Sequence, residues 1–131
     1  MSQTSQITHV EDGSAATFEN APFTPEGLPR TLWWDASAGA LRMIDQTLLP
    51  AQCHVIVCET AEAVGEAIRT LRVRGAPAIG VAAAYGLALG ARETLPPVQP
   101  LDADEALLRL NAIATMLRAT RPTAVNLAWS V

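Results

Sequence analysis

The sequence predicts an α+β fold, in which a small antiparallel three-stranded sheet is followed by a bundle of about four helices. Two observations lead to this prediction. β-prone runs occupy the region from residue 31 to residue 58, with turn residues between them. After residue 58 the hydrophobic period changes to that of an amphipathic helix. With 131 residues, half of them apolar, the chain is long enough for about one domain with a buried core.

The chain divides into a lead-in and one folded domain. Residues 1–28 contain scattered glycines and prolines and no sustained hydrophobic period, so we expect a flexible or irregular segment there. Residues 29–131 are expected to form the domain. Its last residues begin a fourth helix without the residues that normally end one, which predicts a chain truncated within that helix, or one domain of a longer protein. Fraying of a natural helix at the terminus is the alternative.

Three strands are expected in the first half of the domain. Residues 31–35 and 40–45 predict a hairpin, because both runs are β-prone and the segment between them contains Ser37 and Gly39. Residues 54–58 form a third apolar run of strand length. Together they predict the small antiparallel sheet.

The first helix is expected to follow the sheet directly. Thr60 is a suitable N-cap, Glu62 lies near the predicted start, and Arg69 lies near the end, where each charge favours the helix dipole. One apolar stripe predicts the face that packs on the core, and it consists of Val64, Ala67, Ile68 and Leu71.

The other helices are marked by prolines and by their own stripes. Pro77 suits the first turn of a second helix that runs to about Ala91, and its small residues predict close helix contacts at the centre of the domain. A proline-rich loop at 95–100 ends it. Asp102 and Glu105 then resemble a capping box. The stripe of this third helix, which is expected to end near Arg118, is Leu107, Leu110, Ala114 and Leu117, and a fourth helix is expected from Ala124.

Composition limits the classes of function. The formal charge of −4 and the pI near 5.0 disfavour a broad nucleic-acid surface, which is usually basic. The longest apolar run, residues 76–91, is too short and too rich in glycine and alanine to predict a membrane span. The N-terminus has neither a basic nor an apolar signal region. Cys53 and Cys58 match neither a disulfide framework nor a zinc site, so a reduced, cytoplasmic protein is expected.

The candidate site is an anion-binding turn at residues 74–77, where a cation, a flexible backbone and a helix start lie side by side. Arg121 occupies a comparable position before the fourth helix. If the two helix starts point to one place, a phosphate there would meet Arg74, Arg121 and the backbones of Gly75 and Ala76. The alternative is that the two arginines only satisfy carbonyls and the dipole at the ends of the preceding helices.

No residue of the chain is assigned to catalysis or to a metal. Cys53 and Cys58 lie in or beside a β-prone run without a well-placed activating histidine, which favours a structural role. Asp45 lies at a predicted strand end, where stabilisation of a turn is expected. His9 and His54 are expected to be structural or solvated.

Three motifs in the same order resemble a known family. Arg-Gly-Ala-Pro-Ala-Ile-Gly at 74–80, with the apolar run to Gly86, looks like the signature of the 5-methylthioribose-1-phosphate isomerases. Arg-Pro-Thr-Ala-Val-Asn-Leu at 121–127 and Ile-Asp-Gln-Thr-Leu-Leu-Pro at 44–50 resemble two further motifs of that family. The resemblance extends from about residue 28 to the end, and the order of the motifs makes it far more specific than any one of them.

The resemblance implies an aldose–ketose isomerase of methionine salvage that uses no metal or organic cofactor. It implies that Arg74, Gly75, Ala76 and Arg121 hold the phosphate or nearby sugar oxygens of the substrate. Members of the family add a larger Rossmann-like domain, which carries the catalytic cysteine and aspartate, and they usually form homodimers. We therefore expect this chain to be the N-terminal substrate-binding domain and to be inactive alone.

Two alternatives are compatible with the same motifs. Regulatory subunits of translation initiation factor two B share the superfamily, and they bind protein partners and small phosphorylated ligands. Ribose-1,5-bisphosphate isomerase would use a similar phosphate site. The hairpin at 31–45 and the Arg-Gly-Ala-Pro run favour the methylthioribose-1-phosphate isomerase.

Overall fold

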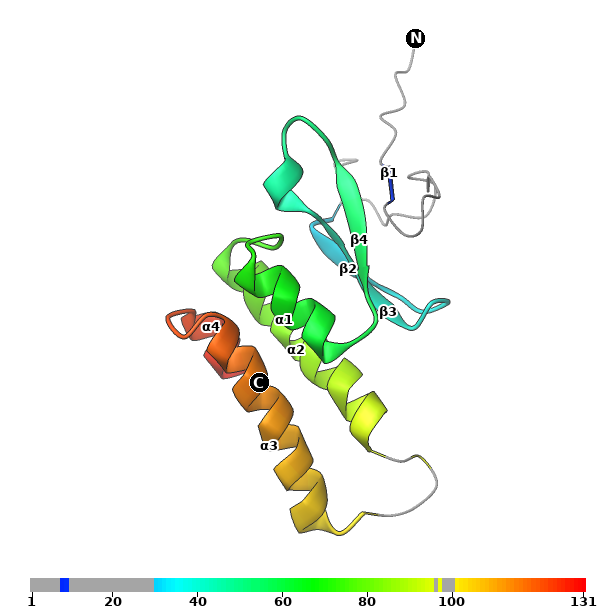
Figure 1. The fold of residues 1–131 in the computed structure, drawn as a ribbon, viewed down its shortest axis with the longest axis vertical. Coiled ribbons are helices and arrows are strands. Elements are labelled where there is room, and N and C mark those ends of the chain that lie inside the picture. Colours follow the sequence, from blue (N-terminus) through cyan, green and yellow to red (C-terminus); the bar gives the residue numbers. More distant parts are fainter. Residues whose placement is uncertain (1–7, 10–29, 96, 98–100) are drawn as a thin grey trace.

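A computed structural model of the chain describes residues 8–9, 30–95, 97 and 101–131. The sheet lies on one side of the molecule, and helices α1 (Ala61–Arg69) and α2 (Ala76–Thr94) lie between it and helices α3 (Ala103–Thr120) and α4 (Val125–Ser130) (Figure 1). The predicted α+β fold is confirmed. Apart from residues 8–9, the predicted lead-in lies outside the described residues.

The three predicted strands are present. Strands β2 (Leu32–Asp35) and β3 (Ala40–Ile44) form the expected hairpin, and β4 (His54–Cys58) pairs antiparallel with β3. A fourth strand that the sequence did not indicate, β1 (Thr8–His9), pairs parallel with β4 and completes the sheet order β1-β4-β3-β2.

Helix α1 begins as predicted and ends earlier than its apolar stripe suggested. The Thr60 hydroxyl accepts a hydrogen bond of 3.1 Å from the backbone nitrogen of Ala63, which caps the helix. The first three residues of the predicted stripe are buried, but Leu71 is 39% exposed. The prediction for Leu71 was wrong because the helix ends at Arg69, and Leu71 turns the chain with a left-handed φ of 63°.

Helix α2 is the central helix, as predicted, and contacts α1, α3, α4 and strand β3. Its glycines lie where neighbouring helices approach closely. A Cβ on Gly86 would lie 3.1 Å from a Val64 methyl and 3.2 Å from a Leu117 methyl, so glycine permits both contacts.

The third helix lacks the predicted capping box. Asp102 is the N-cap residue of α3, but its side chain accepts no capping hydrogen bond. The Glu105 carboxylate accepts a hydrogen bond from Arg109 one turn later, and the two side chains form an ion pair within the helix. Of the predicted stripe, Ala114 and Leu117 are buried, whereas Leu107 is 58% exposed. The helix continues to Thr120 before α4 begins.

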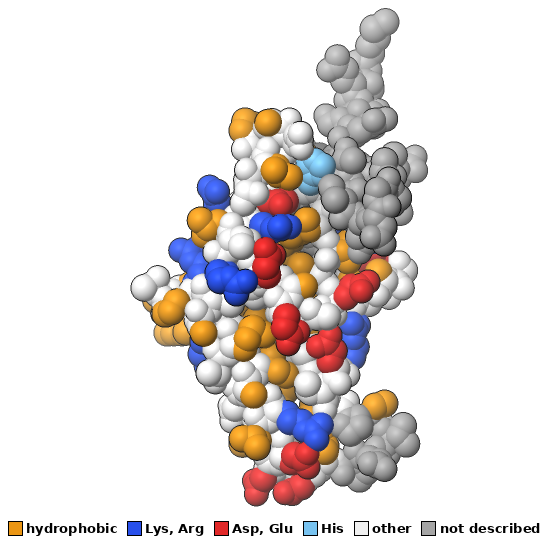
Figure 2. All heavy atoms as spheres, viewed as in Figure 1, with side chains coloured by type: hydrophobic (Ala, Val, Ile, Leu, Met, Phe, Trp, Pro, Cys, Tyr) orange, Lys and Arg blue, Asp and Glu red, His pale blue; other side chains and the backbone are white. Residues whose placement is uncertain are grey.

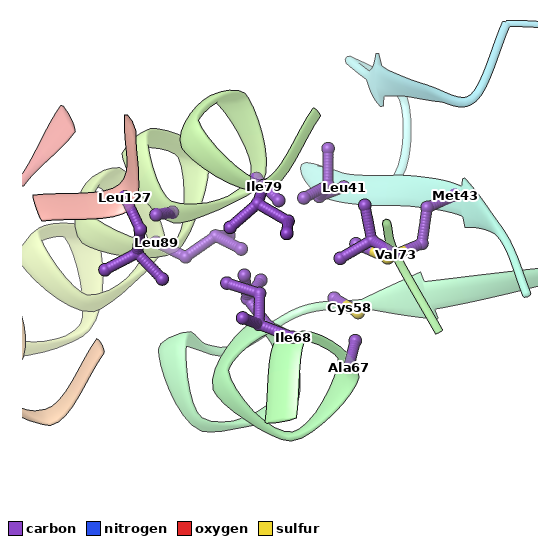
Figure 3. Close-up of a cluster of buried hydrophobic side chains, with 12 residues drawn as sticks. Leu41, Met43, Cys58, Ala67, Ile68, Val73, Ile79, Leu89 and Leu127 are labelled. Atoms are coloured by element: carbon purple, nitrogen blue, oxygen red, sulfur yellow. The ribbon is translucent and has the colours of Figure 1, made fainter. Parts of the chain in front are cut away.

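One core joins the sheet to the helices (Figure 3). Side chains from β3, β4, α1, α2 and α4 meet there, together with Val73 from the turn between α1 and α2. The largest fully buried side chains are Leu41, Met43, Ile68, Leu89, Leu117, Leu127, Val64 and Val73. Within the described parts of the chain, no helix has both the length and the apolar character needed to cross a membrane.

Candidate functional site

The starts of α2 and α4 share one pocket of about 440 Å³. Gly75, Ala76 and Ile79 form the α2 side. The opposite side comes from the α3–α4 connection and the first turn of α4, with Arg121, Thr123, Ala124, Val125 and Asn126. The structure thus brings Gly75, Ala76 and Arg121 together from positions about 45 residues apart, whereas Arg74 is not among the lining residues.

Gly75 gives the turn before α2 a shape that other residues adopt only with strain. Its φ of 88° and ψ of 130° lie outside the regions favoured by L-amino acids. A Cβ built on Gly75 would have no atom within 4 Å. The glycine is therefore required by backbone conformation, and the space beside it is open to the pocket that it lines.

The start of α2 is left uncapped beside the pocket. Gly75 is the N-cap residue, and no side chain makes a capping hydrogen bond. Pro77 follows at the start of the helix, where its missing N–H removes no intrahelical bond. α2 has 19 residues, and the positive end of its dipole lies at the side of the pocket formed by Gly75 and Ala76. The pocket can therefore accept an anion on backbone N–H groups.

Arg121 adds a positive charge to the pocket wall. It is the C-cap residue of α3, and its carbonyl accepts a 3.0 Å hydrogen bond from the backbone nitrogen of Ala124. This bond forms the tight turn that leads into α4. Within the described residues, no carboxylate pairs with the Arg121 guanidinium, so its charge is available to a ligand.

Arg74 lies at the edge of the same region. Its side chain is exposed, and its Nε donates a 3.3 Å hydrogen bond to the carbonyl of Leu71. This is the kind of carbonyl contact that the alternative interpretation of the two arginines predicted. The described part of the chain offers no carboxylate partner to this guanidinium either.

Sequence reasoning missed part of the pocket lining. Thr123 and Asn126 contribute polar side chains, and Ile79 and Val125 contribute apolar ones. Ile79 lies one helical turn after Ala76, so helical spacing could have suggested it. Thr123, Val125 and Asn126 follow Arg121 by two to five residues, across the turn between α3 and α4, and helical spacing gives no signal for them.

The two cysteines lie elsewhere and are poorly suited to nucleophilic chemistry. Burial, and to a lesser degree the nearby Glu66 carboxylate, raises the pKa of the Cys58 thiol to about 11. Burial also raises the pKa of Cys53. Both thiols are free, and they stay protonated near neutral pH. In the described segments, His, Cys, Asp and Glu side chains form no group of three that could hold a metal ion.

Asp45 has the turn-stabilising role that its position predicted. Its side chain is the N-cap of the short 3₁₀ helix η2 (Gln46–Leu48) and accepts a 3.0 Å hydrogen bond from the backbone nitrogen of Thr47.

On the face drawn in Figure 2, acidic and basic side chains are interspersed, without a continuous basic stripe.

Comparison with known proteins shows which families this chain resembles. Residues 72–131, which include the whole pocket lining, match the model of the initiation factor 2 subunit family. A methylthioribose-1-phosphate isomerase of Roseiflexus castenholzii is 50% identical over 101 residues, which are 77% of this chain and 28% of that protein. Another, from Picosynechococcus, is 56% identical over 89 residues, or 68% of this chain and 25% of that protein.

Two solved structures are similar to this chain, one an isomerase and the other a subunit of a translation initiation factor. The 5-methylthioribose 1-phosphate isomerase of Pyrococcus horikoshii matches with a TM-score of 0.68 and 40% identity, over 82% of this chain and 30% of that chain. The delta subunit of the translation initiation factor eIF-2B from A. fulgidus matches with a TM-score of 0.65 and 46% identity, over 77% and 28%. The chain thus spans less than a third of the length of these relatives. Over residues 72–131 it is similar to the initiation factor 2 subunit family, and methylthioribose-1-phosphate isomerases are among the proteins that it resembles.

Proposed function

We propose that this chain is the substrate-binding domain of an isomerase that converts 5-methylthioribose 1-phosphate to 5-methylthioribulose 1-phosphate in methionine salvage. The observation that supports this most directly is the shared pocket at the starts of α2 and α4. Its wall combines an uncapped helix start with an arginine that has no carboxylate partner among the described residues. These are the groups that bind a phosphate dianion.

The phosphate would lie between the backbone of Gly75 and Ala76 and the guanidinium of Arg121. Arg74 would reach the same anion by giving up its 3.3 Å contact with the Leu71 carbonyl, which is long for a hydrogen bond. A hydrogen bond to a charged group contributes about 1.5–3 kcal/mol. Loss of one guanidinium should therefore weaken binding by about tenfold to a hundredfold.

Fixing the phosphate would serve the reaction in a specific way. The C1 oxygen of this substrate is phosphorylated, so the sugar ring cannot open like that of a free aldose, and the protein must assist ring opening. Isomerisation would follow by proton transfer through an enediol or by hydride transfer. Both routes need the sugar held still and water excluded, and positioning can supply on the order of 7–11 kcal/mol at best.

The groups that transform the sugar are proposed to lie in the larger remaining part of such an enzyme. The relatives are more than three times as long as the matched segment, and we assign no catalytic role to any residue here. We therefore expect no turnover from this chain alone. The parent enzyme is proposed to be a cytoplasmic homodimer that uses no metal or organic cofactor, with a small sugar phosphate as its partner and without nucleic-acid or membrane binding.

Binding can be tested on the chain itself by isothermal titration calorimetry with 5-methylthioribose 1-phosphate. Unphosphorylated 5-methylthioribose is the ligand control, and we expect it to bind much more weakly. Arg121→Ala and Arg74→Ala are each expected to lower the affinity by about tenfold to a hundredfold. Arg69→Ala removes the same charge from an exposed position outside the pocket lining, and should change the affinity little.

The result separates the possible roles of the two arginines. Equal losses in all three arginine variants would indicate general electrostatic attraction and would contradict a specific site. Loss in Arg121→Ala without loss in Arg74→Ala would confine the site to the residues that line the pocket. Backbone amide NMR spectra of each variant would confirm that the fold is kept.

A second candidate is a regulatory protein of translation initiation, because the eIF-2B delta subunit from A. fulgidus is 46% identical and similar in structure. Ribose-1,5-bisphosphate isomerase is a further enzymatic candidate. Competition between 5-methylthioribose 1-phosphate and ribose 1,5-bisphosphate for the pocket would distinguish the two isomerases. Preference for ribose 1,5-bisphosphate would favour the second of them.

A further inference from the structure

We propose that Asp45 is a positioning residue of the phosphate pocket, which acts through Arg72 on the turn that leads into α2. Asp45 lies outside the pocket lining, on the connection that follows strand β3. The expected change in phosphate affinity rests on the proposed phosphate site. The effect of Asp45 on the turn can be measured without a ligand.

Asp45 is rigidly attached to the sheet. It is 5% exposed and is the one buried charged residue in the described part of the chain. Its backbone nitrogen donates a 2.8 Å hydrogen bond to the carbonyl of His54 in strand β4. One carboxylate oxygen, Oδ1, accepts from the backbone nitrogen of Thr47 at 3.0 Å and from its hydroxyl at 2.6 Å. The orientation of the carboxylate is therefore fixed before it meets any cation.

The second oxygen of this carboxylate faces Arg72. Asp45 Oδ2 lies 3.7 Å from Arg72 Nη1, and the Glu66 carboxylate lies 3.6 Å from Arg72 Nη2. The backbone of Arg72 is held from the same side, because the nitrogen of Gln46 donates a 2.8 Å hydrogen bond to its carbonyl. Residues 45 and 46 thus hold both the side chain and the main chain of Arg72.

Arg72 is the middle of the turn that sets the position of Gly75. Its own nitrogen donates to the carbonyl of Ala67 at 2.9 Å, and the next residue, Val73, is fully buried in the core. Arg74 and Gly75, by contrast, are exposed. The last residues held in place before the pocket are therefore Arg72 and Val73, and a shift of Arg72 would reach the helix start through Val73.

The sign of the effect distinguishes positioning from simple electrostatics. Asp45→Asn keeps the size of the side chain and an oxygen for the Thr47 bonds, and it removes one negative charge near the proposed anion site. Coulomb's law alone then predicts tighter binding of phosphate. If the turn loosens instead, phosphate binding should weaken by roughly threefold to tenfold. This is the order of magnitude of the interaction free energies between contacting residues.

The experiment uses the full chain and two readouts. Amide hydrogen exchange of Val73, Gly75 and Ala76 without ligand is expected to be faster in Asp45→Asn, and titration with inorganic phosphate, followed by NMR, is expected to show weaker binding. Asp35→Asn is the matched control, because it removes the acid of the 2.6 Å pair with Arg42 in the hairpin. That variant should lose stability without changing exchange near Gly75 or phosphate affinity.

Each outcome decides the proposal. Unchanged exchange in the turn, tighter phosphate binding, or equal effects in the two aspartate variants would overturn it. If Asp45→Asn fails to fold, Arg72→Gln tests the same link and must show the same pattern. If the wild-type chain binds no phosphate at all, the proposed function fails, whereas the exchange measurement still decides whether Asp45 positions the turn.

Discussion

Replacing Gly75 with alanine should destabilise the chain through its backbone alone. The residue has φ 88° and ψ 130°, and a Cβ would meet no atom within 4 Å. No steric contact with a neighbour can therefore contribute to the cost. Positive φ costs an L-residue about 1–2 kcal/mol, and that range is the expected loss of unfolding free energy in Gly75→Ala.

Urea unfolding followed by circular dichroism measures this loss. With a denaturant dependence of about 1–3 kcal/mol/M for a small protein, the unfolding midpoint should fall by roughly 0.3–2 M at unchanged slope. Gly75→Asn is an informative second variant. Asparagine tolerates the left-handed helical region, where ψ is about 30–60°, but the ψ of Gly75 is 130°. Asparagine should therefore be no better than alanine.

Two results would refute this reasoning. A midpoint for Gly75→Ala within error of the wild type would mean that the turn relaxes without cost. A clear recovery in Gly75→Asn would mean that the backbone adopts the left-handed helical conformation in solution. In either case the backbone conformation of Gly75 would not be a fixed part of the proposed phosphate pocket.

Two further predictions concern the core. A Cβ in Gly80→Ala would lie 2.8 Å from the Ser130 hydroxyl and 3.1 Å from the Asn126 carbonyl oxygen, so thermal unfolding should show a loss of about 1–3 kcal/mol; an unchanged melting temperature would contradict the packing of α2 on α4. For Cys58, whose pKa is raised by burial from 9.0 to about 11, the unfolded chain loses its proton first. Its contribution to stability is therefore complete below pH 9 and disappears as the pH rises through 11, by on the order of 2–3 kcal/mol. Urea unfolding at pH 8 and pH 10 should reveal about half of this loss, because pH 10 lies midway between the two pKa values. An equally steep loss in Cys58→Ala would assign it to other groups.

Local patterns in the sequence were sufficient for most of the secondary structure. The Thr60 cap and the β-prone hairpin depend on residues close in the chain, and both are present in the structure. The capping box at Asp102 had the same kind of pattern but did not form, because Glu105 pairs with Arg109. A sequence pattern of this kind predicts which hydrogen bond can form. It does not show whether the side chain bonds instead to a competing partner one turn away.

Contacts between distant residues were beyond the reach of such patterns. Strand β1 has two residues, too few for any period, and depends on its pairing with β4. The Asp45–Arg72 pair joins residues 27 positions apart, and neither position lies on a periodic face. The motifs around residues 74 and 121 did predict two helix starts that could share a ligand, but the common pocket became visible only when α2 and α4 were packed together.

The separation of those two helix starts is set by Gly80. Gly80 lies one helical turn after Ala76 on α2, and its missing side chain allows Asn126 of α4 to approach so closely that an added Cβ would lie 3.3 Å from the Asn126 Cβ. Ala76 and Asn126 both line the pocket. A methyl group at position 80 would therefore move apart the two walls that are proposed to hold the phosphate. Gly80→Ala should consequently weaken phosphate binding as well as stability, whereas Gly86→Ala, on the α1 and α3 side of the same helix, should affect stability alone.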